Sequence, residues 1–144
     1  MDKNIEMRDA VWQLMRTFKY SMKHAVKTGK LEISSVHVRV LHTIELTNNC
    51  TANDVSMQLQ VDKAQIARVV KELIDQEWIV RALHPTDGRS RVLQLTSSGK
   101  TLIEKVHKIE GEVFQVMTQC VSAEEAAVFM NVVKKMSKSL MMTK

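Results

Sequence analysis

The fold of this chain is decided by residues 51–96, which read TANDVSMQLQVDKAQIARVVKELIDQEWIVRALHPTDGRSRVLQLT. Apolar residues recur every three or four positions over 52–59 and over 63–76, which predicts two helices joined by a tight turn. The pattern then changes to that of two strands, over 78–83 and 91–95, with a polar tip between them that contains Gly88. A short helix, a longer helix and a basic hairpin in this order suggest a reader of duplex DNA.

The longer helix of this stretch has two faces of different character. The residues expected to face inward are Ile66, Val69, Val70, Leu73 and Ile74. Those left facing outward are Lys63, Ala64, Gln65, Ala67, Arg68 and Lys71. Glutamine can pair with adenine, arginine can pair with guanine, and small residues allow close approach to a thymine methyl group. The outward face therefore suits a DNA major groove, and a plain solvated helix face is the alternative that this segment alone leaves open.

The tip of the hairpin carries arginine side chains. Arg89 lies in the tip and Arg91 at its edge, where a guanidinium group could enter a minor groove of negative potential. Asp87, two residues before Arg89, could hold that arginine through a charge-assisted hydrogen bond. An ordinary hairpin with a weak surface ion pair is the alternative.

Helices are also predicted on both sides of this stretch, over about 5–28, from Ser34 or Ser35 to about 46, over about 97–119, and from Ser122 onward. Apolar residues in the first and the last helix are spaced alternately by three and four. They are Val11, Met15, Phe18, Met22 and Ala25, and then Ala126, Phe129, Val133, Met136 and Leu140. Such short seams suit packing of the two ends of the chain, within one subunit or between two.

Composition narrows the class of protein. A length of 144 residues, with 44% apolar and 26% charged residues, is typical of one soluble globular domain. The net charge of +5 favours a polyanionic partner. However, residues 51–91 carry six basic and six acidic side chains, so DNA binding would depend on a few well-placed residues. We expect a cytoplasmic protein, because the chain has neither a signal-peptide core nor an apolar run of about 20 residues.

Few residues indicate catalysis, metal binding or redox activity. No nucleophile–base pair, phosphate-binding loop or metal-ligand cluster is recognisable, so we expect no enzyme activity and no cofactor. Cys50 and Cys120 match no metal or redox spacing and are expected to be reduced thiols. His37 and His42 are five residues apart, which does not place them on one helical face.

Several motifs match a known family in register. Val55-Ser56-x-x-Leu59 is similar to a Leu-Ala-x-x-Leu motif at the first reader helix of the MarR family of winged helix-turn-helix transcription regulators. The resemblance continues through Val61-Asp62-Lys63, Arg68-Val69-Val70-Lys71-x-Leu73 and Ile79-Val80-Arg81. It ends with Asp87-x-Arg89 and Leu93-x-Leu95-Thr96-x-x-Gly99, which look like the wing of that family and the start of its dimer helix. The flanking helices match in number, length and order.

This resemblance implies a mainly α fold: one MarR-like domain over 1–144, with a winged helix-turn-helix at about 33–96 and dimerisation helices at about 1–32 and 97–144. It implies a homodimeric repressor that binds a pseudopalindromic operator in double-stranded DNA. The DNA contacts would come from the outward residues of the longer helix, with Arg89 in the minor groove and Asp87 bracing it. A helical protein-interaction module that does not read DNA is the alternative.

The resemblance also implies release from DNA by a small aromatic or anionic effector. Candidate walls of its pocket are Met15, Phe18, Val36, His37 and Val106, although each also fits a plain role in the core. Some relatives sense metals instead, and His42 and His107 resemble part of such a site. Gly111 stands where a second histidine would be needed one turn after His107, so we expect no metal site.

The chain also departs from the family pattern. Gln60 and Glu77 occupy positions that are commonly glycine. A left-handed conformation at either residue would store strain of about 1–2 kcal/mol. Neither cysteine lies in the first helix, where the peroxide-sensing relatives carry theirs, so both are expected to be inert.

Overall fold

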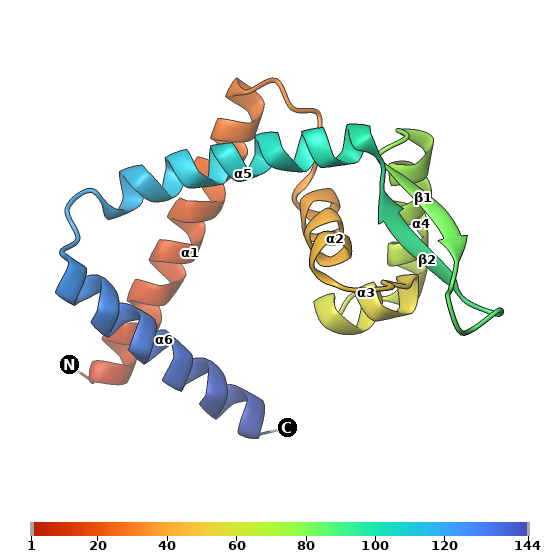
Figure 1. Ribbon diagram of the computed structural model, residues 1–144. Helices are drawn as coiled ribbons and strands as arrows, with labels where there is room; N and C mark the ends of the chain where they lie inside the picture. The colour runs from red at the N-terminus through yellow and green to blue at the C-terminus, as the bar shows by residue number, and fades with distance from the viewer. Residues whose placement is uncertain (1, 144) are drawn as a thin grey trace. The chain divides into compact units, whose positions relative to one another are not determined.

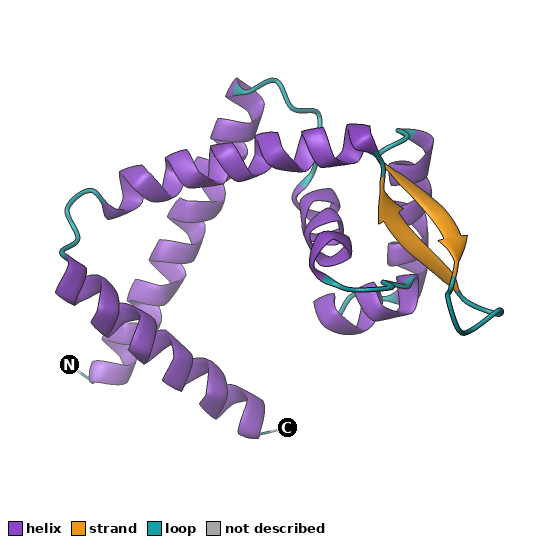
Figure 2. Cartoon of the chain, viewed as in Figure 1, coloured by secondary structure: helices purple, strands orange, loops and turns teal. Residues whose placement is uncertain are grey.

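A computed structural model describes residues 2–143, which form six helices and a two-stranded antiparallel sheet (Figures 1 and 2). Their order is α1 Lys3–Thr28, α2 Ser35–Leu46, α3 Ala52–Leu59, α4 Lys63–Asp75, β1 Ile79–Leu83, β2 Arg91–Leu95, α5 Ser97–Thr118 and α6 Ala123–Met142. The mainly α fold with one hairpin is therefore confirmed. The chain divides into two compact units, residues 1–111 and 112–144. Within residues 2–143, no helix has the length and apolar character needed to cross a membrane.

The core of the first unit contains residues from α2, α4, β1 and α5. Leu41, Leu73, Ile79 and Val106, one from each of these four elements, are completely buried. Burying a side chain of this size stabilises the fold by about 1.5–3 kcal/mol. The inward face predicted for α4 is confirmed, with Ile74 half-buried and the other four residues buried. This packing turns the opposite face of α4 toward solvent.

The helix starts follow the capping residues of the sequence. Thr51 accepts a hydrogen bond of 3.1 Å from the backbone N–H of Asp54, and the Asp54 carboxylate accepts one of 3.0 Å from the N–H of Thr51. Ser122 and Glu125 form the same reciprocal box before α6, as predicted. Aspartate is a common capping residue, so the sequence favours Asp62 as the side-chain cap of α4. Asp62 occupies the N-cap position of α4, but its side chain makes no capping bond with the described residues.

Two non-glycine residues end helices of the reader in a left-handed conformation. Gln60 has φ 52° after α3, and Glu77 has φ 62° after α4. The following N–H groups return to the helices, because Val61 donates to the Ser56 carbonyl at 3.2 Å and Trp78 donates to the Leu73 carbonyl at 3.0 Å. These bonds satisfy the last carbonyls of each helix. The left-handed conformation considered for both positions is thus confirmed.

The hairpin is tied to the helices at its base. The strands pair from Ile79 with Leu95 to Leu83 with Arg91, and the N–H of Leu93 donates to the Cys50 carbonyl at 2.7 Å. This bond joins β2 to the loop before α3. The tip of the hairpin extends beyond the helices of the first unit (Figure 2). Arginine residues on the tip therefore stand away from the core.

Thr96 links the hairpin to α5. Its hydroxyl donates to the Glu77 carbonyl at 2.6 Å and accepts from the N–H of Gly99 at 3.0 Å, which confirms Thr96 as a capping residue. Gly99 packs so closely on Trp78 that an added Cβ would overlap the Trp78 carbonyl oxygen. Gly111 differs, because an added Cβ there would meet no described atom within 4 Å. Gly111 therefore makes no close contact with another element among the described residues.

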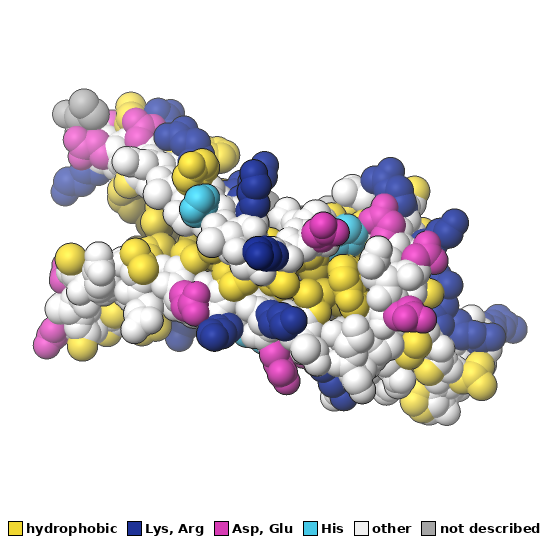
Figure 3. Space-filling model, turned by 90° about the horizontal axis from the view of Figure 1, so that it is seen from above, with side chains coloured by type: hydrophobic (Ala, Val, Ile, Leu, Met, Phe, Trp, Pro, Cys, Tyr) yellow, Lys and Arg dark blue, Asp and Glu magenta, His cyan; other side chains and the backbone are white. Residues whose placement is uncertain are grey.

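Large apolar side chains remain uncovered on the first and last helices, each considered by itself. On α1, Trp12 is 55% exposed and Met15 is 54% exposed. On α6, Phe129 is 56% exposed and Leu140 is 72% exposed. The space-filling view shows hydrophobic side chains open to solvent along this face of the molecule (Figure 3). The apolar seam of each helix is thus not buried within the unit to which that helix belongs.

Candidate nucleic-acid interface

The outer face of α4 carries six exposed candidate residues. They are Lys63, Ala64, Gln65, Ala67, Arg68 and Lys71. The three cations among them form no ion pair with any described residue. Cations without an internal partner are available for phosphates, and an exposed arginine or glutamine can reach base edges. The face therefore has the chemistry of a DNA reader on a helix held rigidly by its buried side.

Asp87 organises the tip of the hairpin, which we call the wing. Its carboxylate accepts a hydrogen bond of 3.0 Å from the backbone N–H of Arg89 and one of 2.9 Å from the Ser90 hydroxyl. The bond from the Arg89 backbone lowers the pKa of this carboxyl, and the Ser90 hydroxyl adds to the effect. The sequence predicted a contact from Asp87 to the Arg89 side chain. The structure instead has Asp87 holding the backbone, which leaves the guanidinium group of Arg89 exposed.

His84 is a wing residue that sequence reasoning missed. Its Nδ1 accepts hydrogen bonds from the N–H groups of Thr86, at 3.2 Å, and Asp87, at 3.0 Å. A side-chain acceptor two or three residues before the donors mimics the turns that asparagine and aspartate make, so a histidine before Pro85 was the available signal. Arg91 turns back on the loop, since its Nη1 donates to the Ser90 carbonyl at 3.3 Å. Arg89 is therefore the arginine of the wing that points outward without such a bond.

Comparison with known proteins gives the same fold. Residues 31–90 match the MarR family. Over these residues, which run from before α2 to the tip of the hairpin, the chain resembles that family. It is 27% identical over 106 residues to the multiple antibiotic resistance protein MarR of Escherichia coli K12, covering 73% of this chain and 74% of that protein. It is also 27% identical over 99 residues to the HTH-type transcriptional regulator BilQ of Clostridioides difficile, covering 69% of this chain and 66% of the relative.

Solved structures confirm the winged-helix fold of this chain. A MarR transcriptional regulator from Methanosarcina mazei Go1 has a TM-score of 0.80 at 20% identity, covering 96% of this chain and 98% of the other. A mutant MarR from E. coli complexed with operator DNA has a TM-score of 0.71 at 23% identity, covering 94% and 99%.

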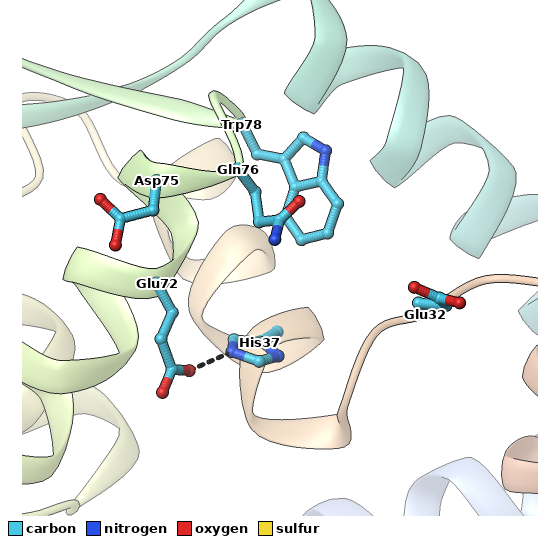
Figure 4. Close-up of a pocket in the computed structure, with 6 residues that line it drawn as sticks. All are labelled: Glu32, His37, Glu72, Asp75, Gln76 and Trp78. Atoms are coloured by element: carbon cyan, nitrogen blue, oxygen red, sulfur yellow. Dashed lines mark hydrogen bonds and ion pairs between the residues drawn. The ribbon is translucent and has the colours of Figure 1, made fainter.

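A cavity of about 290 Å³ lies beside α4. It is lined by Glu32, His37, Glu72, Asp75, Gln76 and Trp78 (Figure 4). Nε2 of His37 lies 2.6 Å from a carboxylate oxygen of Glu72, a contact that joins α2 to α4 and that sequence reasoning missed. The lining has three carboxylates and neither lysine nor arginine. Its charge therefore favours a neutral or cationic molecule over an anion.

The residues predicted for an effector pocket are not brought together here. His37 lines the cavity, whereas Met15 lies exposed on α1. Phe18 and Val36 are half-buried, and Val106 is completely buried in the core of the first unit. Since Val106 has no accessible surface, a ligand could reach it only if α5 moved.

A group of potential metal ligands was also missed. One donor atom each from His42, His107 and Glu110 lies within 4.8 Å of the others. Position 111, one turn beyond His107, is a glycine and offers no ligand. The residue that faces both histidines is Glu110, three positions beyond His107, so a carboxylate stands in the expected place of an imidazole.

Proposed function

We propose that this chain is a sequence-specific DNA-binding transcriptional regulator that represses its targets. The observation that carries the proposal is the exposed face of α4, whose cations form no ion pair within residues 2–143, beside a wing that presents Arg89. Lys63, Arg68 and Lys71 would contact phosphates and base edges in a major groove. Arg89 would enter the neighbouring minor groove, where negative potential attracts a guanidinium group. The match of residues 31–90 to the MarR family supports this assignment.

We further propose that the chain acts as a homodimer on an inverted repeat. The uncovered apolar residues of α1 and of α6 favour burial against another subunit, because single chains rarely leave such residues in solvent. A two-fold dimer would place two α4 helices on half-sites about one helical turn apart. In this proposal residues 1–144 act as one regulatory domain. It would work in the cytoplasm, where it meets chromosomal DNA, and it would have no enzyme activity.

A small molecule would end repression by binding the first unit. The cavity beside α4 offers the indole of Trp78 for an aromatic ring, while Glu32 and Glu72 disfavour an anion. An aromatic effector therefore fits better than an anionic one. Because Glu72 belongs to α4 itself, a ligand that displaces His37 from it would disturb the support of the reader face.

The test is selection of bound sequences from genomic DNA, followed by affinity measurements at several salt concentrations. We expect an inverted repeat whose affinity falls steeply with salt, because bound cations release counterions from DNA. Arg68→Ala and Arg89→Ala should each weaken specific binding by about 1–3 kcal/mol. Arg8→Ala removes the same charge from α1, where Arg8 pairs with Asp9, and should leave affinity unchanged. Unchanged affinity in both reader variants, with the fold intact, would contradict the proposed interface.

One observation favours a second candidate, a protein-interaction module that does not read DNA. Residues 51–91 carry equal numbers of basic and acidic side chains, which weakens any nonspecific attraction to DNA. If no duplex binds even at low salt, while the protein remains folded and dimeric, this candidate is preferred.

A further inference from the structure

The imidazole of His84 is the centre of the turn that begins the wing. His84 follows the end of β1, and Nδ1 of its ring accepts hydrogen bonds from the backbone N–H groups of Thr86, at 3.2 Å, and Asp87, at 3.0 Å. The hydroxyl of Thr86 lies 3.4 Å from the same nitrogen. The backbone N–H of His84 itself donates to the Ser90 carbonyl at 3.3 Å. A single ring nitrogen is therefore the shared acceptor for the first half of the loop.

These contacts determine which nitrogen of the ring carries hydrogen. A backbone N–H group can only donate a hydrogen bond, so the nitrogen that faces two such groups must hold a lone pair. A neutral histidine keeps one nitrogen of this kind, and its hydrogen is then on Nε2. An imidazolium ring carries hydrogen on both nitrogens, so no rotation of the ring would restore an acceptor. The closed turn therefore accepts neutral His84 and excludes the protonated side chain.

The turn held by His84 leads directly to the bonds that place Arg89. The N–H of Asp87 donates to the imidazole, while the carboxylate of Asp87 accepts from the Arg89 N–H at 3.0 Å and from the Ser90 hydroxyl at 2.9 Å. Asp87 is thus fixed by His84 through its backbone and fixes Arg89 through its side chain. Loss of the acceptor on His84 would free the backbone of residues 86 and 87. A looser loop loses more entropy when its arginine enters a groove.

The charged groups around His84 come from the hairpin itself. After the bonds from Arg89 and Ser90, attraction to a protonated His84 also lowers the pKa of the Asp87 carboxyl. Arg89 and Arg91 are positive charges of the same loop and act in the opposite direction. These attractions and repulsions offset one another in part. The lone pair on Nδ1, in contrast, is lost in every protonated ring, so hydrogen bonding decides the response of the turn.

We propose that His84 is a positioning residue of the wing: its neutral imidazole holds the loop that presents Arg89, and protonation of the ring releases this loop. Histidine is the side chain whose charge ordinarily changes between about pH 5 and 8. Because the closed wing excludes the second proton, binding of DNA through that wing releases a proton, and affinity falls as pH falls. This effect on affinity rests on the proposed DNA-binding function, whereas release of the loop does not.

The first experiment follows the loop of the full-length protein without DNA, by NMR of its amide groups from about pH 8 to about pH 5.5. His84→Asn keeps a side-chain acceptor for the same N–H groups and does not titrate, whereas His84→Ala has no acceptor. The amide signals of Thr86, Asp87 and Arg89 should follow titration of the His84 ring in the wild type. They should stay in the closed-loop position at every pH in His84→Asn and in the open-loop position in His84→Ala.

The second experiment measures affinity for a duplex selected with the wild-type protein, at constant ionic strength. The dissociation constant of the wild type relative to His84→Asn should be near one at about pH 8 and rise about fourfold or more by about pH 5.5, since each lost hydrogen bond contributes about two- to tenfold. Both proteins retain the other histidines, such as His37 beside Glu72, so their titration cancels in the ratio. His24→Asn, which changes a histidine stacked on Tyr20 in α1, is the matched control and should follow the wild type.

Circular dichroism shows whether each variant is folded, and His84→Asn decides the question if His84→Ala is not. The proposal is overturned if the loop signals of the wild type ignore the titration of His84, or if His84→Asn responds to pH as the wild type does. It is also overturned if the wild type binds its duplex and the affinity ratio stays near one. A loop that titrates as expected in a protein that binds no duplex would support the role of His84 and contradict the proposed regulator function instead.

Discussion

The carboxylate of Asp87 accepts a hydrogen bond of 3.0 Å from the backbone N–H of Arg89. Asp87 therefore fixes the main chain of the wing. The position of the Arg89 side chain is set through its backbone. Ser90 and His84 add bonds on either side of this link. A loop ordered in this way pre-positions the arginine and lowers the entropy lost when the side chain enters a groove.

Asp87→Asn should weaken DNA binding less than Arg89→Ala does, because it loosens the loop and leaves the guanidinium group present. The difference in affinity between Asp87→Asn and the wild-type protein should shrink in acid. The pKa of Asp87 is lowered in the folded state, so its contribution is present above the ordinary aspartate range and is lost as pH falls through the lowered value. Carboxyl chemical shifts followed by NMR across acidic pH measure this titration directly.

Asp9→Asn is the control for this prediction, because Asp9 is a surface carboxylate of α1 that pairs with Arg8. It should not change DNA affinity. A carboxyl of Asp87 that titrates above the ordinary aspartate range would show that the bonds to Arg89 and Ser90 are absent in solution.

Gln60→Gly and Glu77→Gly should each stabilise the protein. Both residues adopt positive φ, where glycine avoids a strain of about 1–2 kcal/mol but loses about 0.5–1 kcal/mol through the entropy of the unfolded chain. The net gain is expected to be up to about 1 kcal/mol in the free energy of unfolding, measured by urea denaturation. Glu104→Gly, at an exposed position inside α5, should instead destabilise by about 1 kcal/mol. Destabilisation by all three variants would show that the two turns carry no strain.

Local signals explain how much of the fold could be predicted. The bounds of β2 follow from the alternation of apolar and polar residues, and the start of α6 follows from the Ser122–Glu125 capping box. Each of these signals is contained in a few consecutive residues. The left-handed turns could be anticipated because Gln60 and Glu77 stand where related chains carry glycine. The capping bond expected of Asp62 did not form, since a residue type permits such a bond without enforcing the side-chain rotamer.

A site could be predicted from the sequence only where all of its residues lie on a single helix or strand. The exposed face of α4 follows from its own period, because burial of Ile66 and Leu73 dictates which side remains outside. The pairing of His37 with Glu72 and the closeness of His42 to Glu110 depend on how distant helices pack. The spacing of residues within one helix gives no information on how that helix packs against another. The position of the Glu110 carboxylate, which faces both His42 and His107, could therefore not be predicted from the sequence.

Gly99→Ala should destabilise the protein by about 1–3 kcal/mol, because the new methyl group would overlap the carbonyl oxygen of Trp78. Backbone atoms cannot move aside as a flexible side chain can, so α5 would have to shift away from β1. Gly111→Ala is the matched control in the same helix. Its methyl group meets no described atom within 4 Å and should stabilise α5 by up to about 1 kcal/mol. Thermal melting of both variants measures the difference, and equal melting temperatures would contradict the close contact at Gly99.

The two cysteines should differ sharply in reactivity. Cys50 is completely buried, and its burial raises the pKa of the thiol to about 11, whereas Cys120 is exposed. Because the thiolate is the nucleophile, a thiol-specific reagent at neutral pH should modify Cys120 first and Cys50 only when the fold opens. Mass spectrometry after brief labelling identifies the site. Rapid labelling of Cys50 in the native protein would show that the loop before α3 opens easily.

The raised pKa of Cys50 also predicts how the free energy of unfolding changes at alkaline pH. The unfolded thiol ionises near about 8.5, whereas folded Cys50 stays neutral up to about 11. A group whose pKa is raised on folding contributes stability below its unfolded pKa and loses it as pH rises through the folded value. The free energy of unfolding should therefore fall between these two pH values in the wild type and in Cys120→Ala. Cys50→Ala should be less stable at neutral pH, since it leaves a cavity, but should show a shallower fall in alkali. An equally steep fall in Cys50→Ala would assign the alkaline loss to other groups.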